Sequence, residues 1–206
     1  MKKLLIFVIA LIACSDLFAQ DFIKQTEVFR QKYKQEFIKT DNSPLKKEDL
    51  KYLKFYDPDS TFQVPAIFVR AKNSQSFEMP TYSGTKKTFV KYGTVKFRLY
   101  GKKQTLTVYR SLSLQTLPQY RDYLFLPFKD KTSGNETYGG GRYIDLKTSD
   151  VKDGNFLLDF NKAYIPYCAY SEGYNCPIPP KVNTMVVSVE AGEKNFGKDH
   201  EEVSTK

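Results

Sequence analysis

Histidine is almost absent from this chain, and its scarcity removes the commonest catalytic designs. The only histidine among 206 residues is His200, close to the C-terminus. A Ser-His-Asp triad, a Cys-His pair and a multi-histidine metal site each need an imidazole inside the fold. Carboxylates, tyrosine, lysine and cysteine can still support acid–base or nucleophilic chemistry. We expect no metal and no cofactor, and a binding protein rather than an enzyme.

A long apolar run is also missing. The N-terminal run Leu4–Ala13 holds ten apolar residues and follows the positive start Met1-Lys2-Lys3. A membrane-spanning helix needs about 20 apolar residues, so we expect no membrane span. A positive end before a short apolar run is typical of a secretory signal. We therefore expect residues 1–19 to be a signal peptide and the protein to be exported to the periplasm or cell envelope.

Two cleavage sites fit this leader. Leu17-Phe18-Ala19 ends in the small residue that signal peptidase prefers, and a cut there leaves a soluble protein that begins at Gln20. We favour this cut. Alternatively, Leu11-Ile12-Ala13-Cys14 has the pattern of a lipoprotein box, in which lipidated Cys14 becomes the N-terminus. The second cut would give the protein a lipid anchor.

Cysteine is scarce as well. With Cys14 in the leader or at its end, Cys168 and Cys176 are the two thiols of the folded part. Compartments outside the cytosol permit disulfides, so we expect these two residues to be bridged. The alternative is a pair of free, buried thiols.

Positive charge is abundant but dispersed. The formal net charge is +9, and the sequence contains no stripe of lysine and arginine. A basic chain can bind nucleic acid or anionic surfaces. For an exported protein without such a stripe, we expect a solvated basic surface and no nucleic-acid partner.

The residue pattern predicts helices first and strands afterwards. The aromatic stripe of residues 21–39 predicts a helix, and Ser43-Pro44 predicts the start of a short second helix that ends near Leu53. Apolar alternation and turn residues then predict strands at 62–70, 94–99, 105–110, 123–128, 143–146, 156–160 and 185–189. We expect a mainly β fold, a barrel or sandwich-like antiparallel sheet with one or two N-terminal helices. It would form a single domain over residues 20–193, followed by a flexible polar tail, 194–206.

Two segments carry the candidate functional residues. In the first, residues 126–143, consecutive glycines precede Arg142, which could pair with a carboxylate or phosphate. Its spacing matches neither a P-loop nor a dinucleotide fingerprint. In the second, Asp159 and Asn161 share one face of a predicted strand, and a buried Asp159 would need a partner such as Arg142. The predicted ligand-binding residues are Glu136, Tyr138, Gly140, Arg142, Asp159 and Asn161.

Each segment also has a purely structural interpretation. Gly139–Gly141 could form a tight corner in a curved sheet, and Arg142 and Asp159 could form a buried ion pair with capping hydrogen bonds. Cys168 is a weak candidate nucleophile, because no histidine can serve as its base.

The same segments resemble a known family. The resemblance is carried by Glu136-Thr137-Tyr138-Gly139-Gly140-Gly141-Arg142-Tyr143, then Asp159-Phe160-Asn161, Cys168-Ala169-Tyr170, Cys176-Pro177 and Ala191-Gly192-Glu193. With the intervening sequence from about Phe29 to Glu193, they resemble the bacterial family called domain of unknown function 1684. The resemblance implies a shared, β-rich single domain and no particular activity.

Three hypotheses about function remain open. The leading one is a protein of the cell envelope that binds a small molecule or a partner protein. The second is a histidine-independent hydrolase or transferase, in which Asp159 or Glu136 acts as acid or base and Arg142 stabilises negative charge. The third is a structural or interaction protein that uses exposed aromatic residues, from a total of 15 Tyr and 16 Phe.

Overall fold

The computed structural model describes residues 2–198, with side chains from residue 20 onward. Its one α-helix is α1 (Lys2–Lys39). The strands are β1 (Gln63–Arg70), β2 (Ser76–Pro80), β3 (Lys86–Leu99), β4 (Lys102–Ser111), β5 (Tyr123–Phe128), β6 (Arg142–Lys147) and β7 (Asn155–Asp159). The short 3-10 helices are η1 (Lys47–Tyr52), η2 (Ser60–Phe62), η3 (Leu114–Thr116), η4 (Pro118–Tyr120), η5 (Phe160–Lys162), η6 (Tyr167–Ala169) and η7 (Lys181–Asn183).

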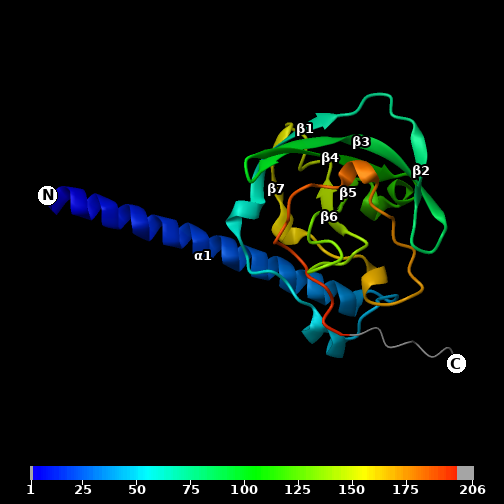
Figure 1. Cartoon of the computed structure of the whole chain (residues 1–206), viewed down its shortest axis with the longest axis horizontal. Coiled ribbons are helices and arrows are strands. Elements are labelled where there is room, and N and C mark those ends of the chain that lie inside the picture. Colours follow the sequence, from blue (N-terminus) through cyan, green and yellow to red (C-terminus); the bar gives the residue numbers. More distant parts are fainter. Residues whose placement is uncertain (1, 199–206) are drawn as a thin grey trace.

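The seven strands form a single curled antiparallel sheet, a half-barrel (Figure 1). Its order is β6-β5-β4-β3-β1-β7, and β2 pairs with the first half of β3. The long strand β3 is central: it pairs with β4 from Phe89 to Leu99, interrupted at Tyr92, and with both β2 and β1 on its other edge. The predicted mainly β fold with an antiparallel sheet is confirmed.

Side-chain alternation explains why this sheet curls around a core. On β4, Leu106 and Val108 are fully buried inside the half-barrel, and on β5 Leu124 and Leu126 are fully buried beside them. Each such side chain contributes about 1.5–3 kcal/mol when it leaves water. The residues between them point to the outer face, where a second, aromatic cluster forms around Phe125. Around β5 the sheet is therefore apolar on both faces.

Two strand predictions differ from the structure. The predicted strand Met185–Val189 is wrong, although its alternation is real: Met185, Val187 and Val189 are buried in the main core and Val186 is exposed. This segment crosses the open side of the half-barrel. It makes only isolated backbone hydrogen bonds with the loop after β5, such as the one from the Met185 N–H to the Lys129 carbonyl at 2.8 Å. Strand β2 was not predicted, because only Met79 among its five residues is buried.

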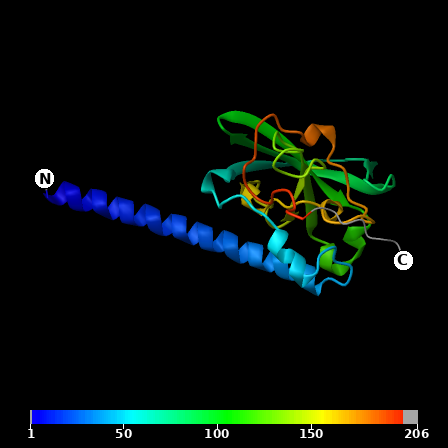
Figure 2. The ribbon, with the colours of Figure 1, turned by 60° about the horizontal axis from the view of Figure 1, so that its bottom comes forward.

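The C-terminal half of α1 packs against the domain, and its N-terminal part extends away from the sheet (Figures 1 and 2). The predicted helix ends at Lys39 as expected, and Phe37 is buried against η6. The predicted second helix is shorter, the 3-10 helix η1. No helix in the described part of the chain is both long and apolar enough to cross a membrane. The side chain of Cys14 lies outside the described residues.

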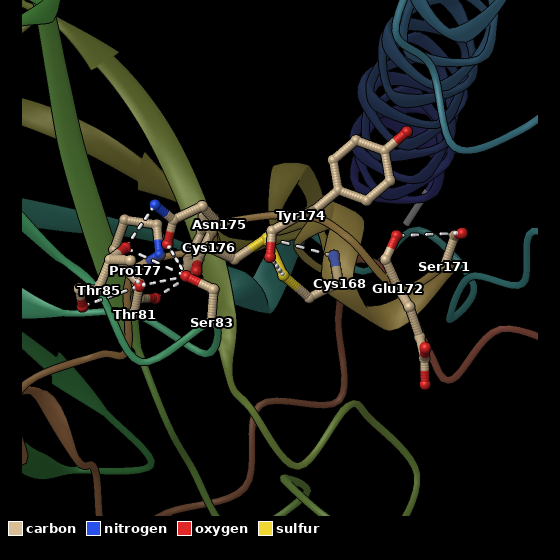
Figure 3. Close-up of a disulfide and its surroundings, with 11 residues drawn as sticks. Thr81, Ser83, Thr85, Cys168, Ser171, Glu172, Tyr174, Asn175, Cys176 and Pro177 are labelled. Carbon is tan, nitrogen blue, oxygen red and sulfur yellow. Dashed lines mark hydrogen bonds between the residues drawn. A yellow bond between two sulfur atoms is a disulfide. The ribbon is translucent and has the colours of Figure 1, made fainter. Parts of the chain in front are cut away.

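Cys168 and Cys176 form a disulfide, as predicted (Figure 3). The bridge closes the loop that carries Asn175, whose side-chain amide donates to Thr85 Oγ1 at 2.7 Å and accepts from Ser83 Oγ at 2.7 Å. These contacts fasten the loop to the β2–β3 turn.

The start of the predicted polar tail is attached to the domain. Lys194, Asn195 and Gly197 donate backbone hydrogen bonds to Lys54, Glu136 and Tyr52, at 2.9–3.0 Å. Residues 199–206 lie outside the described part.

Candidate functional site

Arg142 lies at the centre of a buried polar network. Its side chain is fully buried, and Nη2 forms an ion pair with the equally buried Asp130 at 2.9 Å. The same nitrogen donates to the Val189 carbonyl at 2.7 Å, and Nη1 donates to the carbonyls of Ala191 and Glu193. Arg142 therefore ties the loop after β5 to the C-terminal segment. Its predicted pairing with Asp159 is wrong.

Asp159 and Asn161 form a separate network. Asp159 accepts hydrogen bonds from the Asn161 amides at 3.0 Å and caps η5, and its ion pair is with the half-exposed Lys162 at 3.7 Å. Asn161 is buried and exchanges two hydrogen bonds with the Asp59 backbone at 2.9–3.0 Å. No hydrogen bond or ion pair between described residues joins this network to Arg142. Arg142 and the pair Asp159 and Asn161, which we predicted to form one site, therefore each stabilise a different part of the fold.

The glycine-rich loop forms the tight corner that leads into β6. Gly141 has φ +93° and a Cβ there would lie 2.6 Å from the Phe128 carbonyl, so the corner requires glycine. Gly140 is buried, Tyr138 is half-buried, and Glu136 is exposed. The predicted site residues therefore do not face one common cavity. Within residues 20–198, no group of three or more His, Cys, Asp or Glu side chains is arranged to hold a metal.

A buried carboxylate that we did not predict lies next to this centre. Glu193 is fully buried and accepts hydrogen bonds from Tyr170 Oη at 2.6 Å, Tyr33 Oη at 2.9 Å and the Ile165 amide at 3.0 Å. Loss of hydration raises the pKa of Glu193 to about 7, against the partly opposing effect of these hydrogen bonds and of Arg142. Because Tyr33 belongs to α1, the carboxylate attaches the helix to the C-terminal segment.

The outer face of the sheet carries a cavity of about 240 Å³. Strands β3, β4, β5 and β6 form its floor, since the residues that alternate with the core point outward here. Half of its lining residues are aromatic, and the others include two serines and one lysine. The lining includes Lys87, Phe89, Tyr123, Phe125, Tyr143 and Tyr164.

A lysine lines the cavity, and two of its tyrosines donate hydrogen bonds to a carboxylate that is not part of the lining. Loss of hydration lowers the pKa of Lys87, which lies on β3 and has no salt-bridge partner within the described residues. On β6, Asp145 accepts hydrogen bonds from Tyr123 Oη at 2.8 Å and Tyr164 Oη at 2.7 Å. Desolvation raises the pKa of Asp145 and these hydrogen bonds oppose it. Lys87 and Asp145 lie on strands separated by β4 and β5.

Sequence reasoning missed this cavity, although a signal for it was present. Tyr123 and Phe125, and likewise Tyr143 and Asp145, occupy alternate positions opposite buried leucines and isoleucine. When one face of a strand carries leucine and isoleucine and the other face carries mainly aromatic residues, the strand is predicted to pack against other residues on both faces of the sheet. The alternation does not show, however, that the strands of Tyr123 and Tyr143 are neighbours in the sheet.

Replacing one partner of the buried ion pair should cost far more than replacing Asp159. We expect Asp130→Asn to lower the free energy of unfolding by about 3–5 kcal/mol, because it leaves Arg142 charged, buried and unpaired. Asp159→Asn should cost about 1 kcal/mol, the value of a helix cap, because its ion pair is partly exposed. Urea unfolding of the two matched variants measures both. Equal losses would contradict the assignment of Arg142 to Asp130.

Glu193 should make stability depend on pH. Its pKa rises from 4.5 to about 7 on folding, so the folded state binds the proton more tightly. The free energy of unfolding should therefore fall by about 3 kcal/mol as pH rises through this window. Glu193→Gln lacks this titration. Unfolding curves of both proteins across this pH window give their free energies of unfolding. The free energy of unfolding of the wild type should fall relative to that of the variant as pH rises, whereas parallel pH profiles would contradict this.

Comparison with known proteins agrees with this fold and adds no activity. A solution NMR structure of an uncharacterized protein from Haloarcula marismortui is 32% identical, covers 87% of this chain and 97% of its own, and superimposes with a TM-score of 0.66. No protein with a curated description matches. A family model described as "Protein of unknown function (DUF1684)" matches residues 48–194, which include Asp130, Arg142 and Glu193. The chain belongs to this family.

Proposed function

We propose that this protein binds a small molecule with a planar, apolar body and an anionic group in the cavity on the outer face of the sheet. The observation that carries the proposal is the pairing of an aromatic-lined cavity of about 240 Å³ with a single cation in its lining, Lys87. Ligand cavities are mostly apolar and contain a few polar groups that fix orientation. The proposal moves the binding site away from Arg142 and Asp159.

The chemistry of the walls supports this ligand class. Phe89 and Phe125 stack at 5.6 Å, and Phe125 meets Tyr143 edge to face at 4.7 Å, so the floor offers ring surfaces to a planar body. An anion next to Lys87 would compensate the hydration that this ammonium loses, because the low dielectric strengthens their attraction. The carboxylate of Asp145, which accepts hydrogen bonds from Tyr123 and Tyr164 of the lining, disfavours a second negative charge beside those two rings.

The enzyme hypothesis has no support of comparable strength. Arg142, to which it assigns the stabilisation of negative charge, has no exposed side-chain surface and is bonded to Asp130. In this structure a substrate could not touch it.

Lys87→Gln should weaken binding of aromatic carboxylates, such as benzoate and naphthoate, by about tenfold, the value of one charge-assisted hydrogen bond. The wild type should also lose affinity as pH rises through the lowered pKa of Lys87, because the ammonium becomes neutral. Calorimetric titration with these acids measures both effects.

The matched control is Lys86→Gln, which removes the same charge from an exposed neighbour whose side chain points to the opposite side of β3. It should bind like the wild type. Equal losses in the two variants, or stronger binding of aromatic amines than of aromatic acids, would overturn the proposal.

We further propose that the protein acts outside the cytosol, in the periplasm or cell envelope. Support comes from the positive start, the short apolar run Leu4–Ala13 and the small residue Ala19. The Cys168–Cys176 disulfide fits an oxidising compartment. Cleavage after Ala19 releases the protein, whereas lipidation of Cys14 anchors it.

Mass spectrometry of the protein purified from its own cells tests this proposal. We expect an N-terminus at Gln20, unchanged by Cys14→Ser. A lipidated N-terminal Cys14, abolished by the same substitution, would show export by the other route. An intact Met1 on the mature protein would contradict export.

A further inference from the structure

The concave side of the half-barrel ends in a cluster of positive charge. On β1, Phe68 belongs to the core, and on β4 Val108 does. Arg70 and Arg110 lie two residues further along these strands. Because side chains alternate between the two faces, both arginines are on the same concave face as the core, just beyond its end. The sequence alone shows these arginines as dispersed, because 40 positions separate them.

A β-bulge brings one aromatic ring to both arginines. The register of β3 against β4 shifts between Lys91 and Gly93, which leaves Tyr92 without a partner on β4. The Arg70 guanidinium carbon lies 3.6 Å from the centre of the Tyr92 ring, and that of Arg110 lies 4.4 Å from it. Both charges are thus held at one ring.

The bulge depends on glycine. A Cβ on Gly93 would lie 2.6 Å from the Val69 carbonyl and would overlap the Phe68 ring. Only glycine lets β3 approach β1 this closely. The arrangement around Tyr92 is therefore built into the backbone and does not rest on flexible side chains alone.

No carboxylate neutralises this cluster. In the part of the chain that the structure describes, Arg70, Lys91 and Arg110 form no salt bridge, and the Nε of Arg110 is buried without a hydrogen-bond partner. Like charges held together in a partly desolvated site repel, and an anion would relieve that repulsion.

Two cavities meet at this cluster, and both are lined by Arg70 and Tyr92. One, of about 530 Å³, adds the hydroxyls of Thr148 and Ser149 and the ammonium of Lys152. The other, of about 300 Å³, adds Asn73, Ser74, Lys91, Arg110 and Gln115. The lining contains four cations, several neutral hydrogen-bonding groups and no carboxylate.

We propose that the cluster around Arg70, Tyr92 and Arg110 is a second binding site, which takes a phosphate group. A dianionic phosphate offers several acceptor oxygens and enough charge to match converging guanidinium groups, which bind phosphate in bidentate fashion. The phosphate belongs either to a soluble ester or to the headgroup of an anionic lipid. The site lies on the face of the sheet opposite the aromatic cavity, so it is independent of the ligand proposed there.

The first arm of the test titrates the purified protein with pyrophosphate by calorimetry, at low and at physiological ionic strength. The second arm measures cosedimentation with phosphatidylglycerol vesicles against phosphatidylcholine vesicles. Arg110→Gln should weaken binding by about tenfold in whichever arm shows it. Its thermal unfolding without phosphate should change little, because Arg110 loses no salt bridge and only a partly exposed cation–π contact with Tyr92.

The matched control is Arg98→Gln on β3, an exposed arginine that donates to the Gly101 carbonyl at the hairpin turn. It removes the same charge and should not change binding. Binding of pyrophosphate assigns the site to soluble phosphates, and binding of vesicles alone assigns it to lipid headgroups. Binding in neither arm, no effect of Arg110→Gln, or equal losses in both variants would overturn the proposal.

Discussion

The buried ion pair between Arg142 and Asp130 is the constraint on which the rest of the structure depends. A curled antiparallel sheet that stops short of closure leaves its apolar concave face open to water. The chain closes that side with residues 185–191, whose buried side chains complete the core, yet this segment has no continuous strand partner. Arg142 supplies the missing hydrogen bonds, because its guanidinium donates to the carbonyls of Val189, Ala191 and Glu193.

The charge of Arg142 can be buried because all of its partners belong to the segments that close the open side of the half-barrel. Asp130 Oδ2 pairs with Arg142, while Asp130 Oδ1 accepts from the Thr132 amide at 2.8 Å and from the Val189 amide at 3.2 Å. A buried pair of this kind is costly to form and very costly to break on one side. It therefore contributes more to the choice of a single closed arrangement than to net stability. Glu193 continues the network to α1 through Tyr33.

The sequence predicted the elements better than their contacts. Period-2 alternation identified six of the strands because burial on one face is a local property of each strand, as in Thr105–Arg110. It could not say that Arg142 pairs with Asp130 rather than Asp159, since both carboxylates follow apolar strands and only the strand order decides between them. The same limit hid the aromatic cavity and the two cavities at Arg70. Arg70 and Arg110 meet at the ring of Tyr92, which a bulge leaves without a partner on β4.

Native-state hydrogen exchange of the Val189 amide tests the central claim, that Arg142 and Asp130 lock the C-terminal segment over the core, most directly. This amide has a carboxylate oxygen of Asp130 as its acceptor, and no strand ladder protects it. If the ion pair holds the closure, Val189 should exchange only by global unfolding, as slowly as the most protected amides of β3 and β4. Exchange of Val189 by a separate, low-energy local opening, with β3 and β4 still protected, would contradict it.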